Sequence, residues 1–219
     1  MNNLDKTWED LQKQWDMAAE TKYYRDYIAQ GYNEEEAFRE VGRNCVYKFI
    51  SILSEYDINL RGKCLLELGC GSGRMTEFLA QEANYVYAMD ISVKMIKRFK
   101  QRLGNIKNVK TIGGANNLKI FATNSIDIIL SDLVFQHNPE IIVKKFIEGA
   151  WRILTPNGYL IFQIPIRTKH LVVLQKSGAI DMVYWTAKEI NNLANKYFYK
   201  IIRKPKKGSH YVIFKKKYI

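Results

Sequence analysis

The most informative segment of this chain is Leu65-Leu66-Glu67-Leu68-Gly69-Cys70-Gly71-Ser72-Gly73-Arg74. A short apolar run, typical of a buried strand, leads into three glycines at alternate positions, and a helical pattern follows. Glycines in such a turn allow a positive φ and let a ligand lie directly against the backbone. Because ligands of open α/β sheets bind beyond the carboxyl ends of the strands, this turn is predicted to bind one. Its GxGxG spacing differs from the GxGxxG of dehydrogenases, and the chain has no GxxxxGK[ST] phosphate loop.

A carboxylate follows the next predicted strand. Tyr87-Ala88-Met89-Asp90 ends that strand, and Asp90 lies 17 residues after Gly73. An acid at this place can accept hydrogen bonds from both hydroxyls of a ribose. Capping of the following helix is the alternative role for such a residue. Taken together with the glycine loop, we interpret Asp90 as part of a nucleoside site.

Short apolar strands alternate with helices over the rest of the chain. The strands are expected at Cys64–Leu68, Tyr85–Met89, Val109–Ile112, Ile126–Leu130 and Tyr159–Ile164, and the helices at Arg74–Ala83, Ser92–Leu103, Pro139–Leu154 and Thr186–Lys196. This alternation predicts a parallel sheet with right-handed crossovers. The last two strands, Phe198–Lys204 and His210–Lys216, are joined by a short link and must therefore be antiparallel neighbours.

The first 55 or so residues have helical patterns. Leu4, Trp8, Leu11 and Trp15 follow one another at helical spacing, and Thr7 resembles an N-cap. A second helix is expected after an N-cap at Asn33, because three glutamates follow it, where the helix dipole favours acids.

Composition narrows the class of protein. The chain has 219 residues, of which 47% are hydrophobic and 26% charged, enough for one sizeable core. Three scattered cysteines, Cys45, Cys64 and Cys70, form no CxxC pair and no zinc-like cluster, so we expect a reducing, cytoplasmic compartment and no structural metal. No apolar run approaches the ~20 residues of a spanning helix, so no membrane association is expected.

The net charge of +12 is concentrated in the tail. Residues 190–219 contain no acid and nine bases: Lys196, Lys200, Arg203, Lys204, Lys206, Lys207, Lys215, Lys216 and Lys217. One interpretation is attraction of a polyanion such as RNA. The other is a pair of charged edge strands that resist aggregation.

Five segments, in order, resemble class I S-adenosylmethionine-dependent methyltransferases. Glu67–Gly73 with Asp90-Ile91-Ser92 resembles motifs I and II of that family. Asp127–Ser131 resembles its fourth strand, Leu133–His137 the segment after it, Trp151–Leu160 the turn into strand five, and Trp185-Thr186 with Glu189-Ile190 its usual ending. The resemblance covers residues 60–219. It implies an α/β fold with a seven-stranded, mostly parallel, doubly wound sheet whose last strand is antiparallel. We expect residues 1–57 to form a helical lid and residues 58–219 the Rossmann-like methyltransferase domain.

The resemblance also implies a cofactor site for S-adenosyl-L-methionine, whose product is S-adenosyl-L-homocysteine. The residues assigned to it are Glu67, Gly69, Cys70, Gly71 and Gly73 in the first motif, Asp90 on the ribose, Ile91 and Met95 on the adenine, and Ser131 beside the sulfonium. The family often has an acid where this chain has Gly114, so Ala115 or Asn116 is expected to contact the adenine instead. Trp15, Tyr23 and Tyr24 are candidates for an aromatic lid, with core packing as the alternative.

The family reaction is an in-line displacement at the methyl group and needs no metal. His137 is the candidate general base, since an imidazole titrates near neutrality; shaping the loop is its alternative role. Arg167, Lys169 and His170 are candidates for binding the acceptor, because Arg grips carboxylates and phosphates. We therefore expect methylation of O or N of a small, anionic metabolite.

Two alternatives remain for the function. The first is an RNA or protein methyltransferase that uses the basic tail. The sequence Ser131-Asp132-Leu133-Val134 stands where base-amine methyltransferases have an Asp/Asn-Pro-Pro-Tyr/Phe motif, which argues against methylation of an exocyclic base amine. The second is a nucleoside-binding protein without catalysis.

Overall fold

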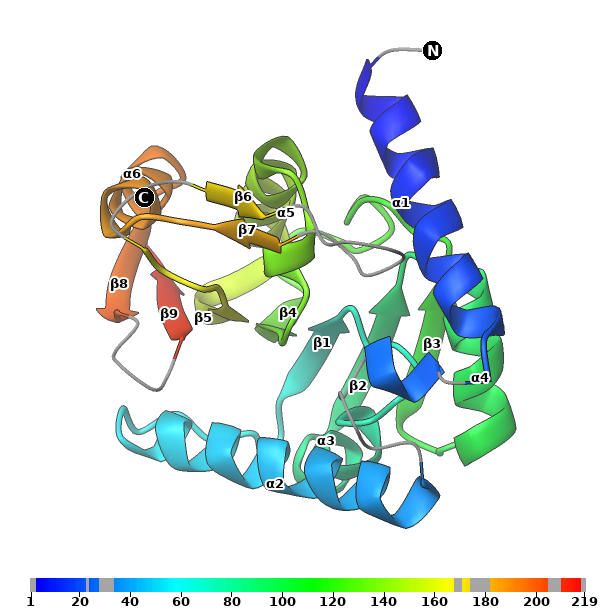
Figure 1. Cartoon of the computed structure of the whole chain (residues 1–219). Helices are drawn as coiled ribbons and strands as arrows, with labels where there is room; N and C mark the ends of the chain where they lie inside the picture. The colour runs from blue at the N-terminus through cyan, green and yellow to red at the C-terminus, as the bar shows by residue number, and fades with distance from the viewer. Residues whose placement is uncertain are drawn as a thin grey trace. The chain divides into compact units, whose positions relative to one another are not determined.

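The glycine-rich stretch belongs to the first of two units into which the chain folds, Met1–Asn116 and Asn117–Ile219. The computed structural model describes residues 3–22, 24–27, 34–167, 171–173, 182–204 and 210–217 (Figure 1). The expected lid, residues 1–57, falls inside the first unit. Its separation from the rest of the chain at residue 57 stays a prediction.

The first unit contains a parallel sheet with the strand order β3-β2-β1. Its strands are β1 (Cys64–Leu68), β2 (Tyr85–Asp90) and β3 (Val109–Gly113), and the crossovers contain α3 (Thr76–Glu82) and α4 (Val93–Leu103). Leu65, Leu66, Val86 and Ala88 are fully buried, as expected of a sheet covered on both faces. All five elements were predicted to within about two residues at each end.

Three elements precede this sheet: α1 (Asn3–Glu20), the short 3₁₀ helix η1 (Tyr24–Tyr27) and α2 (Glu35–Ser54). The prediction that Thr7 caps the first helix is wrong, because α1 already begins at Asn3 and Thr7 lies inside it. The second helix has Glu34 as its N-cap, and the expected cap Asn33 lies outside the described residues. Among the described helices, none combines the length and hydropathy of a membrane span.

Four strands of the second unit belong to the main sheet, in the order β4-β5-β9-β8. They are β4 (Ile126–Ser131), β5 (Leu154–Gln163), β8 (Tyr199–Arg203) and β9 (Tyr211–Lys216); the helical elements are η2 (Phe135–His137), α5 (Glu140–Ile153) and α6 (Ala187–Lys196). The β4–β5 pair is parallel, whereas β9 runs antiparallel to both β5 and β8. Phe162 and Phe214 stack edge to face in the core at 5.1 Å between centroids. The predicted fold class, with seven strands and an antiparallel end, is confirmed.

Strand β5 begins five residues earlier than predicted, at Leu154 instead of Tyr159. The turn expected there is part of the strand, and the pairing with β4 shifts register across it. Asn157 has a φ of +63°, the left-handed geometry that asparagine tolerates. A Cβ on Gly158 would lie 2.9 Å from the carbonyl oxygen of Asp127, so this glycine permits the close approach.

A separate hairpin of β6 (Leu171–Val173) and β7 (Met182–Tyr184) was not predicted. Strands of three residues are too short for a period of two to be recognised in the sequence.

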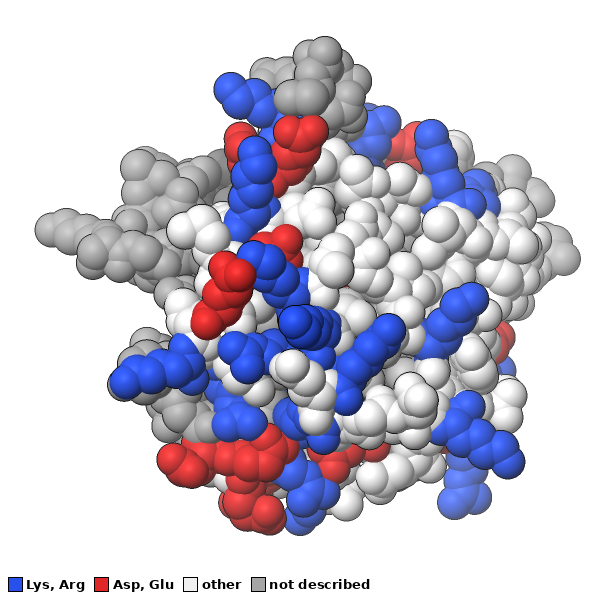
Figure 2. All heavy atoms as spheres, turned by 90° about the vertical axis from the view of Figure 1, so that its right-hand side faces the viewer, with Lys and Arg blue, Asp and Glu red and all other residues white. Residues whose placement is uncertain are grey.

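Two of the basic side chains in the C-terminal tail are buried inside the second unit. Arg203 and Lys216 are buried: an Nη1 hydrogen of Arg203 bonds the Tyr211 carbonyl at 2.6 Å, and Lys216 Nζ donates to the Leu154 carbonyl at 2.7 Å. The other described bases of the tail lie at the surface or half-buried, namely Lys196, Lys200, Lys204, Lys215 and Lys217. Lys206 and Lys207 lie outside the described residues. Figure 2 shows a different face, on the side where Figure 1 labels α1 and α4, and there Lys and Arg side chains are interspersed with Asp and Glu.

Candidate cofactor site

The glycine loop lies against the end of β2. The amides of Gly69 and Cys70 both donate to the carbonyl of Met89, at 2.7 and 3.0 Å. Gly69, Gly71 and Gly73 have φ values of +82°, +54° and +84°, which side chains rarely adopt. At Gly73 a Cβ would also lie 2.6 Å from the ring of Phe99 on α4. The three glycines therefore suit the turn, and Gly73 in addition permits the close packing of α4.

Asp90 joins the loop to the end of β2. Its Oδ2 accepts the amide of Gly71 at 2.8 Å, and its Oδ1 accepts the amide of Ser92 at 2.8 Å. Burial raises the pKa of this carboxyl to about 6; the two amide bonds oppose the shift, and the charge of Asp16 adds to it. Each carboxylate oxygen can accept a further hydrogen bond, so the pair of oxygens fits a ribose diol.

The other residues of the first motif are tightly held. Glu67 is buried and accepts the hydroxyl of Thr76 at 2.5 Å. Burial, with the charges of Asp90 and Glu67, raises the pKa of the Cys70 thiol well above its ordinary value, so it is no thiolate nucleophile. The Ser72 hydroxyl is completely buried and has no hydrogen-bond partner among the described residues. A hydroxyl left unpaired inside the loop fits a site that a polar ligand completes.

Met95, Trp15 and Tyr24 are brought together. Met95 is buried in a cluster with Ala18, Ala19 and Tyr24, and Trp15 packs against the same cluster. Trp15 of α1 and Tyr24 of η1 thus pack at the start of α4, an arrangement that accords with core packing as well as with a lid. Tyr23 lies outside the described residues.

The segment after β3 approaches Asp90 through the backbone. The amide of Gly114 donates to the Asp90 carbonyl at 3.1 Å, and Gly114 has a φ of +72°. Ile91, Ala115 and Asn116 are half-buried beside this segment and on it. Their contacts with an adenine stay a prediction.

In the second unit, Ser131 ends β4, and its buried hydroxyl has no hydrogen-bond partner within the described ranges. His137 ends η2, and its Nε2 lies 3.0 Å from Nε2 of Gln136. The Gln136 amide nitrogen can only donate, so this arrangement places the imidazole lone pair on Nε2. Arg167 is exposed and lies 4.1 Å from the ring centroid of Tyr184. The predicted acceptor residues Lys169 and His170 lie outside the described residues.

Sequence reasoning missed side chains that hold the site from behind. Asp16 of α1 accepts the Ser92 hydroxyl at 2.5 Å and the Lys94 amide at 3.1 Å. Nothing in the sequence indicates this contact. Arg102 of α4 bonds the backbone of the glycine loop. The sequence could have indicated a role for Arg102, because helical spacing places it on the same buried face as Met95 and Phe99. A charged side chain on a buried face needs hydrogen-bonding partners.

Comparison with known proteins agrees with this geometry. Residues 66–162 match the family described as methyltransferase domain. A phosphoethanolamine N-methyltransferase of Triticum aestivum is 31% identical over 118 residues, which are 53% of this chain and 23% of that protein. The chain thus spans less than a quarter of that curated relative.

Solved structures share the fold over most of the chain. Magnesium protoporphyrin IX methyltransferase from Synechocystis PCC 6803, with bound SAH, has a TM-score of 0.68 at 16% identity and covers 95% of this chain and 99% of its own. Phosphoethanolamine N-methyltransferase 1 of Haemonchus contortus has a TM-score of 0.66 at 15% identity, covering 98% of this chain and 50% of its own. Residues 66–162 thus match a methyltransferase domain, and the chain has the class I methyltransferase fold of these solved structures.

Proposed function

We propose that this chain binds S-adenosylmethionine at the glycine loop and Asp90 and transfers its methyl group to O or N of a small, anionic metabolite. The observation that carries the proposal is the buried Asp90 carboxylate, which accepts the Gly71 amide and has acceptor capacity left on both oxygens. A buried carboxylate is costly unless hydrogen bonds compensate it, and a ribose diol supplies two.

The residues of the first unit suit the cofactor's parts. The alternate glycines leave the backbone bare where the methionine portion and the ribose would lie. Asp90 would hold the ribose hydroxyls, and Ile91 and Met95 would pack near the adenine. When bound, S-adenosylmethionine supplies a methyl group on a positively charged sulfur, which a nucleophile takes by in-line displacement. The protein's part is to orient the reactants and exclude water, which can account for a large share of the rate.

His137 is our candidate for the general base. As placed, its Nε2 faces the amide nitrogen of Gln136 and therefore carries a lone pair, the form that can accept a proton. Moving away from Gln136 would free that lone pair for the hydroxyl of an acceptor. An amine acceptor that is neutral once desolvated needs no base.

The acceptor class is supported by Arg167 and by the relatives. Arg167 lies over Tyr184, which holds the side chain by a cation–π contact at an exposed position. A guanidinium binds phosphate or carboxylate oxygens through parallel N–H groups. The aligned proteins of Triticum aestivum and Haemonchus contortus are named for phosphoethanolamine, a small phosphorylated amine.

The proposal is tested by calorimetry followed by product analysis. Purified protein is titrated with S-adenosylmethionine and with S-adenosylhomocysteine, and wild type is compared with D90A. The matched control is D57N, since Asp57 is exposed and its φ of +57° is tolerated by asparagine. We expect binding by wild type and D57N and loss of binding by D90A. If folded wild type binds neither compound, the proposal is wrong.

The acceptor is then sought with labelled S-adenosylmethionine. Phosphoethanolamine and pools of phosphorylated or carboxylated metabolites are incubated with the protein, and methylated products are identified by mass. Label transfer is expected to a small anionic compound. Tight cofactor binding without transfer to any pool would favour the non-catalytic alternative.

A macromolecular substrate is the second candidate. Its support is the set of exposed lysines in the second unit, Lys196, Lys200 and Lys204. The burial of Arg203 and Lys216 weakens it, because those charges are used inside the unit. RNA binding whose affinity falls steeply with salt would favour this candidate over a small metabolite.

A further inference from the structure

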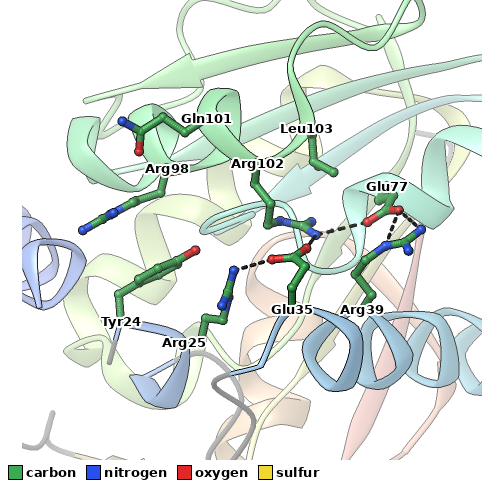
Figure 3. A pocket seen from close by; sticks show the side chains of 9 residues that line it. All are labelled: Tyr24, Arg25, Glu35, Arg39, Glu77, Arg98, Gln101, Arg102 and Leu103. Atoms are coloured by element: carbon green, nitrogen blue, oxygen red, sulfur yellow. Dashed lines mark hydrogen bonds and ion pairs between the residues drawn. The ribbon is translucent and has the colours of Figure 1, made fainter. Parts of the chain in front are cut away.

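Charged side chains of alternating sign line a pocket of about 530 Å³ in the first unit (Figure 3). Arg25 of η1 pairs with Glu35 of α2, and Glu35 pairs with Arg102 of α4 at 3.0 Å. Arg102 also pairs with Glu77 of α3 at 3.1 Å, and Glu77 pairs with Arg39 of α2 at 2.6 Å. Arg102 therefore stands at the centre of a chain of ion pairs that joins four helical elements.

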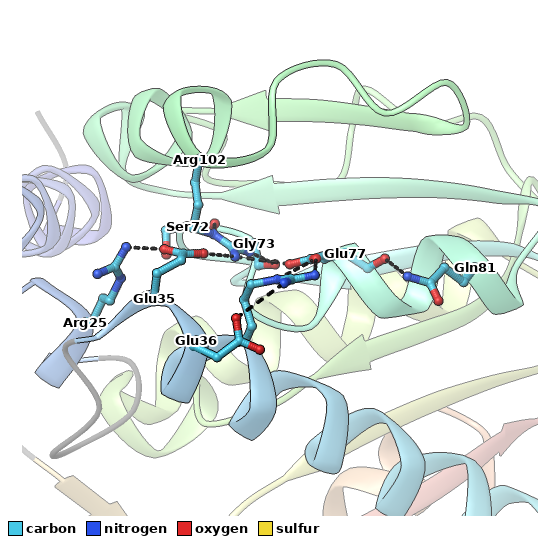
Figure 4. Close-up of polar contacts among 9 residues, drawn as sticks. Arg25, Glu35, Glu36, Ser72, Gly73, Glu77, Gln81 and Arg102 are labelled. Atoms are coloured by element: carbon cyan, nitrogen blue, oxygen red, sulfur yellow. Dashed lines mark hydrogen bonds and ion pairs between the residues drawn. The ribbon is translucent and has the colours of Figure 1, made fainter.

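Arg102 also bonds the glycine loop itself (Figure 4). Its Nε donates to the carbonyl of Ser72 at 3.0 Å, and its Nη2 donates to the carbonyl of Gly73 at 2.6 Å. The side chain is only 5% exposed, so these charge-assisted bonds are shielded from solvent. One guanidinium thus holds two consecutive carbonyls of the loop on one edge and two carboxylates on the other.

The geometry of this side chain is fixed from several directions. A guanidinium is planar and carries five N–H donors in a rigid fork, so two carbonyls and two carboxylates use it in one orientation. The ring of Phe38 on α2 lies 5.5 Å from its central carbon, which adds a cation–π contact. The Glu35 side chain is 43% exposed, but both of its oxygens are paired: Oε1 with Arg102 and Oε2 with Arg25. The second pair holds the carboxylate in place beside Arg102.

We propose that Arg102 is a positioning residue for the cofactor: it holds the carbonyls of Ser72 and Gly73 away from the ligand side and so preorganises the loop for S-adenosylmethionine. The proposal rests on the proposed function. A loop that is ordered before binding loses less conformational entropy when the ligand arrives, which raises affinity without any contact to the ligand. Through Glu35 and Arg25, the order of the loop also depends on the segment that precedes the sheet.

The competing explanation is that Arg102 stabilises the unit as one member of the ion-pair chain and nothing more. The two explanations predict different effects on cofactor affinity when Arg39, at the end of the series of ion pairs, is replaced. Arg39 donates from Nε and Nη2 to a single oxygen of Glu77, Oε1, at 2.9 and 2.6 Å, whereas the hydrogen bonds to the carbonyls of Ser72 and Gly73 come from Arg102. R39Q therefore removes ion pairing from the same chain of charges while leaving the loop contacts of Arg102 in place. Lys100, exposed in the same last turn of α4, supplies the surface control K100A.

The experiment measures two quantities on the whole chain for R102A, R102K, R39Q and K100A. The first is deuterium exchange of the segment 69–75 without any ligand. The second is the dissociation constant of S-adenosylhomocysteine by calorimetry, at a temperature where thermal denaturation shows each variant folded. R102K is included because R102A leaves Glu35 and Glu77 facing an empty position and can fail to fold. Lysine keeps the charge but cannot span both carbonyls with a fork.

We expect faster exchange of the loop in R102A and R102K and a dissociation constant raised by about tenfold or more in R102A, the size of one or two lost charge-assisted bonds. R102K should fall between R102A and wild type. R39Q should lower the melting temperature and leave the dissociation constant within about twofold of wild type, as should K100A.

Loop exchange at the wild-type rate in R102A and R102K would overturn the proposal. So would a loss of affinity in R39Q as large as in R102A, because ion pairing alone would then explain it. Should wild type bind no S-adenosylhomocysteine, the proposed function fails, and the exchange measured without ligand still decides whether Arg102 orders the loop.

Discussion

The Asp90 carboxylate closes the glycine loop onto β2, since its Oδ2 accepts the backbone N–H of Gly71 at 2.8 Å. The acid of the second motif and the middle glycine of the first are therefore one hydrogen-bonded unit before any ligand binds. This pairing explains how a carboxylate can be almost completely buried at the end of a strand: two backbone amides compensate it in part. It also links the protonation of Asp90 to the loop that would hold the cofactor.

Cofactor affinity should depend on pH with a midpoint near 6. Burial raises the pKa of Asp90 to about 6 in the ligand-free protein. Ribose hydroxyls donate to the ionised carboxylate, so binding favours ionisation and releases a proton below and around that pH. We expect the affinity for S-adenosylhomocysteine to rise from pH 5 to pH 7 and then level off. Calorimetry at pH 6 in buffers of different ionisation enthalpy measures the released proton. An affinity that is flat over this range would contradict the prediction.

Replacing Gly73 by alanine should cost more stability than the same change at Gly62. Both glycines have a positive φ, +84° and +70°, so both substitutions strain the backbone by about 1 kcal/mol. A Cβ at Gly62 meets nothing within 4 Å, whereas one at Gly73 lies 2.6 Å from the Phe99 ring. G73A should therefore lose about 1–3 kcal/mol more than G62A through overpacking. Urea unfolding measures the free energy of unfolding of the two variants. Equal losses would contradict the prediction and show that α4 accommodates the added methyl group without a loss of stability.

Removing Asp16 should loosen α1 and shift the titration of Asp90. D16A deletes the acceptor of the Ser92 hydroxyl and the Lys94 amide, a loss of about 1 kcal/mol typical of a helix N-terminal contact. It also removes a like charge that raises the pKa of Asp90, so the midpoint of cofactor affinity should move below that of wild type. The control is D10A, an exposed residue on the same helix. An unchanged midpoint in D16A would mean that Asp16 does not affect Asp90.

Lys216 should matter to stability and its neighbour Lys217 should not. The Lys216 ammonium donates to Asn124 Oδ1 and to the Leu154 carbonyl, both at 2.7 Å, and lies 4.5 Å from the Trp151 ring. K216A should cost about 2–4 kcal/mol, because it also leaves a buried carbonyl without its donor. K217A, at an exposed position, should stay within about 0.5 kcal/mol of wild type. Thermal unfolding measures the stability of both variants. If K216A and K217A both had only small effects, the hydrogen bonds of Lys216 would not contribute to stability.

Substitution of His137 tests the assignment of the base. H137Q should lower kcat by about a hundredfold or more with a hydroxyl acceptor, the size of a general-base contribution, while cofactor affinity is unchanged. The acidic limb of the pH profile of kcat should disappear with it. Turnover and a pH profile like those of wild type would show that His137 shapes the loop instead.

Local rules explain the parts that were predicted well. The strands β1, β2 and β4 are short apolar runs, and the helices between them have apolar faces with a period near 3.6, so each element could be recognised within its own segment. The glycine loop and Asp90 could also be predicted from their own segments, because a glycine at a turn and an acid at the end of a strand are each recognised from a few neighbouring residues. The antiparallel end of the sheet followed from the short link before β9.

The local patterns therefore establish the succession of strands and helices along the chain, the glycine turn and the acid at the end of the second strand. Which buried polar groups meet becomes visible only in the folded chain: Arg102 donates to the carbonyl of Ser72, 30 residues away, and Asp16 accepts the hydroxyl of Ser92, 76 residues away. Such partners have no sequence signature, because a hydrogen bond requires proximity in space and any compatible residue can supply it. The same holds for Lys216, whose charge suggested a solvated tail until folding placed its ammonium against a buried carbonyl.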